Sequence, residues 1–166
     1  MKKKIYTRMT IISVIFTIIT MIASVGIFYN MYRSQVMEDL KTHVHILKTT
    51  EAVLEYIEKD FDPKIDNLRI IDSDGKVEYD SNADIGSMEN HGNRPEVKQA
   101  LKTGSGSAIR ESGTLEKNTY YYAEKMNDGQ IIRVAKEAGN LWQFGAQIFP
   151  IFLEVLLWQN FWQKVL

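Results

Sequence analysis

The hydrophobic pattern of the chain begins with a long uncharged segment. Residues 9–32 contain no charged side chain, and isoleucine, valine and phenylalanine recur throughout them. About 20 helical residues cover the roughly 30 Å hydrocarbon layer of a bilayer. The pattern therefore predicts a transmembrane helix over 9–32, after a short basic N-terminus at 1–8. A cleaved signal peptide is the alternative, but its apolar core normally runs only about 7 to 15 residues.

A second apolar segment, residues 138–166, contains more polar positions. We expect it to be a second transmembrane segment, although Glu154 would cost about 2–3 kcal/mol near a bilayer centre. Trp158-Gln159 recurs as Trp162-Gln163, and Trp-Gln codons read in a shifted frame encode Ala-Lys. One interpretation is a frameshift near residues 152–155 that truncated a longer protein. The other is a natural short tail whose tryptophans lie at the lipid interface.

Between these segments the pattern first has the period of a helix. Apolar residues recur at steps of three, four or seven and form one stripe. They include Val36, Leu40, Val44, Leu47, Leu54 and Ile57. The first membrane helix is therefore predicted to continue outward over 33–60, until Asp62-Pro63 ends it. Two interpretations of the stripe stay open: it pairs with its copy in a signalling homodimer, or it covers the sheet of its own domain.

From residue 68 to residue 137 the period changes to two, which is typical of strands. The predicted strands cover residues 68–72, 77–80, 107–112, 118–126 and 130–136. Asp-Gly pairs at Gly75 and Gly129 predict hairpin turns. A short helix should begin near Pro95 and end at Gly104. The order predicts an α+β fold, with a long N-terminal helix and an antiparallel sheet of about five strands.

Charge predicts the orientation in the membrane. The N-terminal cations Lys2, Lys3, Lys4 and Arg8 favour a cytoplasmic N-terminus, which places residues 33–137 outside the cytoplasm of a bacterial cell. That segment has 15 basic and 20 acidic side chains, a net charge of −5. The acidic balance argues against a nucleic-acid partner. The sequence has no cysteine, which excludes disulfides and thiolate metal sites.

An ordered series of short motifs then suggests a family. The motifs cover Ile70–Val77, Tyr79–Ser81, His91–Val97, Leu101–Gly104, Ser107–Arg110 and Tyr120–Ala123. The series resembles the extracytoplasmic sensor region of bacterial membrane histidine kinases, in particular the phosphate-regulon type with one Cache or PAS-like domain. The resemblance implies a homodimer in the lipid bilayer that responds to an unknown small molecule or protein. It also implies a HAMP linker, a kinase core and a response regulator for an intact parent protein, which this chain is expected to lack by truncation.

The same resemblance implies a small pocket between the sheet and a loop that connects two strands. An anionic ligand there needs donors such as guanidinium, ammonium or phenol groups. Our candidates are Arg94, Arg110, Tyr122 and Lys125. The alternative is structural: the arginines pair with nearby acids such as Glu96 at the surface, and tyrosines on a strand pack in the sheet.

Catalysis and metal binding have weaker support. Asp72, Asp74, Asp80 and Asp84 fit turn capping better than acid–base chemistry, and no Gly-x-Ser-x-Gly motif occurs. An EF-hand would need a glutamate at residue 83, which is alanine. We therefore expect no catalytic residue, metal or cofactor in this chain. Two alternatives stay open: a sensor module of a chemoreceptor or cyclase, and a stand-alone membrane-anchored binding protein.

Overall fold

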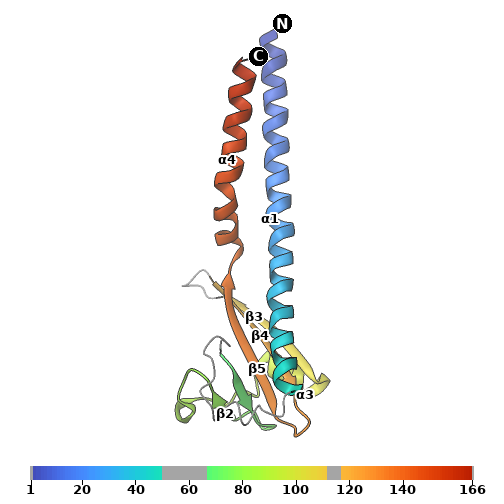
Figure 1. Ribbon diagram of the computed structural model, residues 1–166, viewed down its shortest axis with the longest axis vertical. Coiled ribbons are helices and arrows are strands. Elements are labelled where there is room, and N and C mark those ends of the chain that lie inside the picture. The colour runs from blue at the N-terminus through green and yellow to red at the C-terminus, as the bar shows by residue number, and fades with distance from the viewer. Residues whose placement is uncertain (1, 50–66, 112–116, 166) are drawn as a thin grey trace. The chain divides into compact units, whose positions relative to one another are not determined.

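One long helix and a five-stranded sheet form most of the structure (Figure 1). The computed structural model describes residues 2–49, 67–111 and 117–165. In chain order the elements are α1 Lys2–Thr49, β1 Arg69–Ile71, β2 Val77–Asp80, η1 Ile85–Ser87, α3 Pro95–Thr103, β3 Ser105–Glu111, β4 Lys117–Lys125, β5 Ile131–Gly139 and α4 Leu141–Val165. Contacts divide the chain into two units, one of Met1–Arg33 with Gly139–Leu166 and one of Ser34–Ala138.

The unit of Met1–Arg33 and Gly139–Leu166 is built from apolar helix. Large side chains on the first part of α1 are exposed, among them Phe16 at 71% and Ile22 at 69%. The hydroxyls of Thr17 and Thr20 donate to backbone carbonyls four residues earlier, which satisfies them without water. By length and composition, α1 and α4 are each apolar enough to cross a membrane. Surfaces of this kind are stable in lipid rather than in water.

The sheet has the strand order β2-β1-β5-β4-β3, so β5 is its central strand. β1 pairs antiparallel with β2 and with β5. Ile70 lies opposite Tyr79 in the first pair and opposite Ile132 in the second. β3 pairs antiparallel with β4, where Ala108 lies opposite Tyr121. The predicted α+β fold with an antiparallel sheet of about five strands is confirmed.

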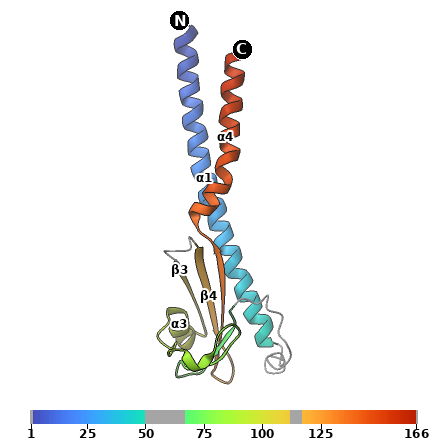
Figure 2. The ribbon, with the colours of Figure 1, turned by 90° about the vertical axis from the view of Figure 1, so that its left-hand side faces the viewer.

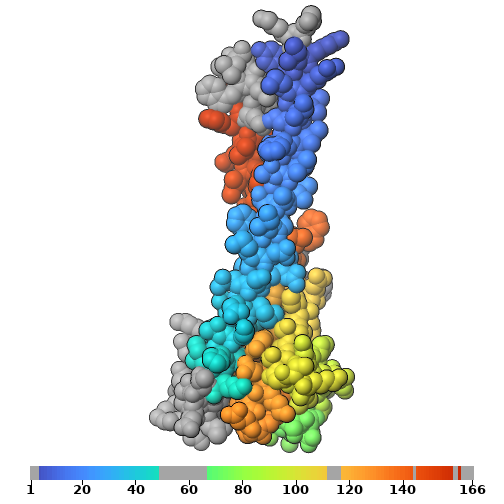
Figure 3. Space-filling model, turned by 90° about the vertical axis from the view of Figure 1, so that its right-hand side faces the viewer, coloured from blue at the N-terminus to red at the C-terminus, as the bar shows by residue number. Residues whose placement is uncertain are grey.

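The apolar stripe of α1 covers one face of this sheet. Val36, Leu40, Val44 and Leu47 are buried in a cluster with Leu68, Tyr120, Ile132, Val134 and Ala138. The cyan end of α1 accordingly lies against the orange β4–β5 segment (Figure 3). Of the two interpretations left open, the structure shows these four side chains covering the sheet of their own domain, and the predicted homodimer stays a prediction. The remaining stripe residues, Leu54 and Ile57, and the predicted helix end near residue 60 lie outside the described residues.

Helix α3 covers the opposite face, which gives three layers in the unit of Ser34–Ala138 (Figure 2). Val97 and Ala100 of α3 are buried with Ile71, Val77, Ala123 and Ile131 of the sheet. The helix approaches β3 closely at Gly106, where an added Cβ would collide with the carbonyl oxygen of Glu96. At its other end, Gly104 adopts φ 90° and donates to Ala100 O at 2.9 Å. Glycines at both places therefore let α3 lie directly on the sheet.

The turns follow the predicted chemistry, whereas several strand ends and one short helix differ from the prediction. Gly75 and Gly129 both have positive φ, 89° and 93°, as Asp-Gly hairpin turns require. Strand β3 begins at Ser105 rather than at 107, and β5 extends to Gly139 rather than ending at 136. The short 3-10 helix η1 was not predicted, and Asp84 caps it by accepting from Gly86 N at 3.1 Å. The end of the predicted strand at 112 lies outside the described residues.

The covering role of α1 predicts a stability effect. Leu40→Ala should lower the free energy of unfolding by about 3 kcal/mol, because it opens a cavity between α1 and the sheet. Ile46→Ala is the matched control, since Ile46 lies on the same helix but is exposed, and it should stay within about 0.5 kcal/mol. Pulse proteolysis of the detergent-solubilised chain in urea measures both. Equal losses for the two variants would contradict the packing described here.

Candidate functional site

A row of polar side chains crosses all five strands on the α3 face of the sheet. Arg69 on β1 lies opposite Asp80 on β2 and opposite Arg133 on β5. Arg69 Nε donates to the Asp80 carboxylate. The row continues through Tyr121 on β4 to Arg110 on β3. We call these five residues the charged row. It exists because strand alternation sends Arg133 to the α3 face, while its neighbours Ile132 and Val134 face α1.

Glu96, in the first turn of α3, binds two residues of the charged row, Arg110 and Arg133. Its side chain is 0% exposed. Arg110 Nη2 donates to both carboxylate oxygens, at 2.9 and 2.8 Å, and Arg133 Nε donates to Oε1 at 2.8 Å. The position near the helix N-terminus also favours a negative charge. One carboxylate therefore joins α3 to β3 and β5.

The ring of Tyr121 fixes the two guanidinium groups. The Cζ atoms of Arg110 and Arg133 each lie 4.3 Å from the centre of this ring. Arginine stacks well on aromatic faces, where the attraction adds to the ion pair. Glu96, Arg110, Arg133 and Tyr121 thus form a closed arrangement, which we call the Glu96 cluster.

Electrostatics keep the cluster charged. Burial raises the pKa of the Glu96 carboxyl, but its own backbone N–H, Arg133 and Arg110 together outweigh burial and hold the pKa below its ordinary value. Burial lowers the pKa of the Arg133 guanidinium, and Glu96 opposes that shift. Glu96 is therefore ionised at neutral pH, and the Arg133 guanidinium, whose side chain is 3% exposed, has its counter-ion within hydrogen-bond distance.

His91 lies close enough to Arg69, Arg94 and Arg133 to feel their charges, and a loop holds it there. His91 N donates to Gly75 O at 2.7 Å, and Asn90 Nδ2 donates to Asp74 O at 2.8 Å. Gly75 and Gly92 are in such close contact that a Cβ on Gly75 would collide with the Gly92 backbone. The loop before α3 is therefore fastened to the β1–β2 turn.

The imidazole of His91 is buried and uncharged. The residue is 5% exposed, and its Nδ1 has no hydrogen-bond partner in the part of the chain that the structure describes. Burial, followed by the charges of Arg69, Arg133 and Arg94, lowers its pKa to about 4, and only Glu96 acts in the opposite direction. His91 is therefore neutral at neutral pH, mainly because it is buried, and the three arginine charges add to that effect.

The four ligand candidates named from the sequence do not converge on one place. Arg110 belongs to the Glu96 cluster, and its partner is the buried Glu96 rather than a surface acid. Arg94 is half-buried at the N-cap of α3, and within the described residues its side chain makes no hydrogen bond or ion pair. Tyr122 packs against the α1-side core on the other face, and Lys125 is exposed at the end of β4.

Most of the charged row was not predicted from the sequence. Arg69, Arg133 and Tyr121 of the row were not among the candidates, nor were His91 and the central role of Glu96. A signal was present for Arg133, because it is the one charged residue in the run Ile131–Ala135. A charge inside a short apolar run is a buried charge that needs a partner. Among the described residues, no group of three or more His, Cys, Asp or Glu side chains is placed to hold a metal.

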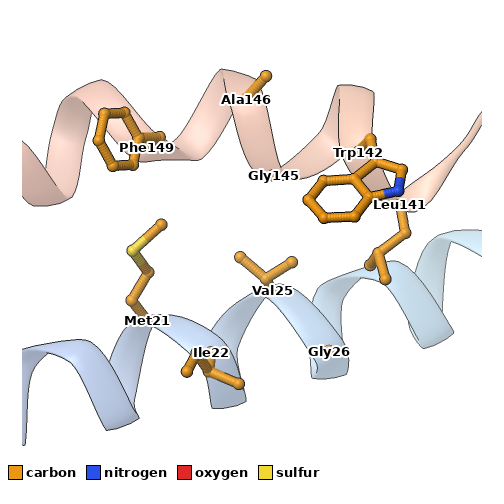
Figure 4. A pocket seen from close by; sticks show the side chains of 9 residues that line it. All are labelled: Met21, Ile22, Val25, Gly26, Leu141, Trp142, Gly145, Ala146 and Phe149. Carbon is orange, nitrogen blue, oxygen red and sulfur yellow. The ribbon is translucent and has the colours of Figure 1, made fainter.

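A separate apolar groove lies within the unit of Met1–Arg33 and Gly139–Leu166. Its volume is about 670 Å³, and it is lined from α1 by residues such as Met21 and Val25 and from α4 by Trp142 and Phe149 (Figure 4). Its lining is apolar apart from the indole N–H of Trp142, so the groove offers little to a polar ligand.

Comparison with known proteins agrees with the fold. Residues 34–132, more than half of the chain, match the single Cache-like family. The chain therefore belongs to this family, which identifies its sheet domain as an extracytoplasmic sensor module. No curated protein and no solved structure matches the chain.

The buried ion pair predicts a large mutational effect. Glu96→Gln should lower the free energy of unfolding by about 3–5 kcal/mol, because Arg133 then keeps a buried charge without its counter-ion. The matched control is Glu137→Gln, which breaks the exposed 3.3 Å pair with Lys117 and should cost at most about 1 kcal/mol. Urea unfolding of the solubilised chain gives both values. Similar losses would show that the Glu96 cluster does not hold α3 to the sheet.

His91 predicts a pH dependence of stability. Its pKa is about 4 in the folded chain and 6.5 when unperturbed, so the unfolded state binds more protons between these values. The contribution of neutral His91 is complete above about pH 6.5 and is lost as the pH falls to about 4. Thermal melts of wild type and His91→Gln over this range should therefore converge towards low pH. The contribution of Glu96 falls in a lower window, below about pH 4.5. Parallel curves for the two proteins would contradict this assignment.

Proposed function

We propose that this chain is the sensing and membrane-anchoring part of a bacterial two-component histidine kinase. The family match supports the sensor role, and the motif series described above supports the kinase context. The observation that carries the proposal is that apolar helix adjoins the sheet domain in the chain at both ends. α1 runs without a break from its apolar part into the stripe on the sheet, and β5 ends at Gly139, immediately before α4.

The stimulus we propose is an anion received on the α3 face. Arg94 is half-buried and without a described side-chain partner, and Arg110 is 32% exposed at the edge strand. Arg69 and Arg133 lie opposite each other on β1 and β5 on the same face. Three arginines, at positions 69, 110 and 133, contact two carboxylates there, those of Asp80 and Glu96, and Arg94 adds a further positive charge at the N-cap of α3. An anionic group would reduce this imbalance.

Transmission of the signal to the membrane would use α1, which continues into its own apolar part, and β5, which leads into α4. β5 presents Arg133 to the α3 face and Ile132 and Val134 to α1. A ligand that prefers one arrangement of α3 would therefore change the packing of β5 and α1 together. The change that crosses the membrane would be a small shift or rotation of α1, α4 or both.

Other kinds of protein can contain the same sensor domain. A Cache-like domain also suits a chemoreceptor, a cyclase or a stand-alone binding protein. The genes beside the coding sequence separate these candidates. A response-regulator gene favours the kinase context, whereas chemotaxis or cyclase genes favour the alternatives.

The proposed orientation predicts a labelling pattern. Because the chain has no cysteine, Lys98→Cys on the exposed side of α3 and Lys4→Cys before the apolar segment each give one thiol. A membrane-impermeant maleimide added to intact bacteria should label Lys98→Cys and leave Lys4→Cys unlabelled until the cells are opened. The reverse pattern, or protection of both thiols, would rule out an extracytoplasmic sensor.

A further inference from the structure

The binding groups for a carboxylate already stand together in the Glu96 cluster. Both Glu96 oxygens accept from Arg110 Nη2, Arg133 Nε adds a third contact at 2.8 Å, and the Tyr121 ring lies against both guanidinium groups. Fork-shaped donors stacked on an aromatic ring are an arrangement that recognises free carboxylates. In this chain the carboxylate is supplied by the protein itself.

Two features would let an anion from solvent replace the Glu96 carboxylate. Arg110 is 32% exposed at the edge of the sheet, so an anion from solvent can reach one of the two guanidinium groups directly. Glu96 also belongs to the first turn of α3, next to Pro95 and to the loop that carries His91. The carboxylate can therefore leave only if the start of α3 moves, which couples its release to the fold.

Stability alone does not require such a pair. A buried ion pair is often no more stabilising than well-packed apolar residues of the same volume. A well-attested use of buried polar contacts is to specify one arrangement over another. Here the two arrangements would be α3 held by Glu96 and α3 released from it.

We propose that Glu96 is an internal competitor, which occupies the anion site between Arg110 and Arg133 until a small external carboxylate displaces it. This inference rests on the proposed sensor function and adds the ligand class and the event that binding triggers. A tethered group competes at an effective concentration in the millimolar range or above. The wild-type chain should therefore bind a simple carboxylate weakly, and removal of the tethered group should strengthen binding at least tenfold.

Acetate is the probe, because it matches the end of the glutamate side chain. Acetate binding is measured by isothermal titration on the full chain in detergent at neutral pH, with sodium chloride at equal ionic strength as the reference. Glu96→Ala empties the site and should bind acetate at least tenfold more tightly than wild type. Glu96→Ala combined with Arg110→Gln should lose that gain. Glu96→Gln retains the side-chain volume and replaces Glu96→Ala in the test if Glu96→Ala fails to fold. Its gain in acetate affinity should be smaller.

The wild type supplies a readout that a purely structural ion pair would not change. Acetate should speed hydrogen exchange of the Val97 and Lys98 amides in the first turns of α3, because displaced Glu96 no longer holds the helix start. An unchanged exchange rate at saturating acetate, or no gain in affinity in either Glu96 variant, overturns the proposal.

The outcomes also separate this inference from the proposed function. If wild type binds acetate, sulfate or phosphate with loss on Arg94→Gln but with no gain in the Glu96 variants, the competitor role fails and an anionic stimulus survives. If no variant binds any of these anions, both the competitor role and the anionic stimulus fail. The membrane orientation is tested independently by the thiol labelling.

Discussion

The contact of Glu96 with Arg110 and Arg133 determines how the α3 side of the domain is assembled. Three hydrogen bonds of 2.8–2.9 Å join the first turn of α3 to an edge strand and to the central strand. Because Glu96 is fully buried, its desolvation is compensated only while both arginines are in place. The apolar contacts of Val97 and Ala100 lie on the same helix, so the ion pair and the apolar packing depend on the same position of α3.

Local pattern was enough to predict most of the secondary structure. The helical period of the stripe, the alternation of the strands and the Asp-Gly turns all arise from short-range geometry. Gly75, Gly104 and Gly129 each adopt the positive φ that their turn or helix end requires. What the pattern left open was the partner of the α1 stripe, because periodicity identifies an apolar face but not the surface that covers it.

The candidate site was predicted less well, for a related reason. Charged residues on strands are usually expected to face solvent. Here the α3 face carries an apolar cluster at Ile131 and a buried ion pair two residues further on, at Arg133. Arg69 and Arg133 become neighbours only through the pairing of β1 with β5, which are about sixty residues apart in the chain. Glu96 looked like an ordinary first-turn acid, and Gly106 gave no local sign that α3 would lie within contact of β3.

β5 is the element in which these features meet. Ile131 and Arg133 contact the α3 side, Ile131 in the apolar cluster and Arg133 on Glu96, while Ile132, Val134 and Ala138 contact α1. An edge strand could shift with little effect on the second layer, but a central strand packed on both faces cannot. Asn140 Oδ1 then accepts from Gln143 N at 3.0 Å, so the chain passes from the end of β5 into α4 through a single capping residue. Any rearrangement of α3 that moves Arg133 therefore acts on the strand that adjoins the second apolar helix, and the same strand holds α1 on its other face.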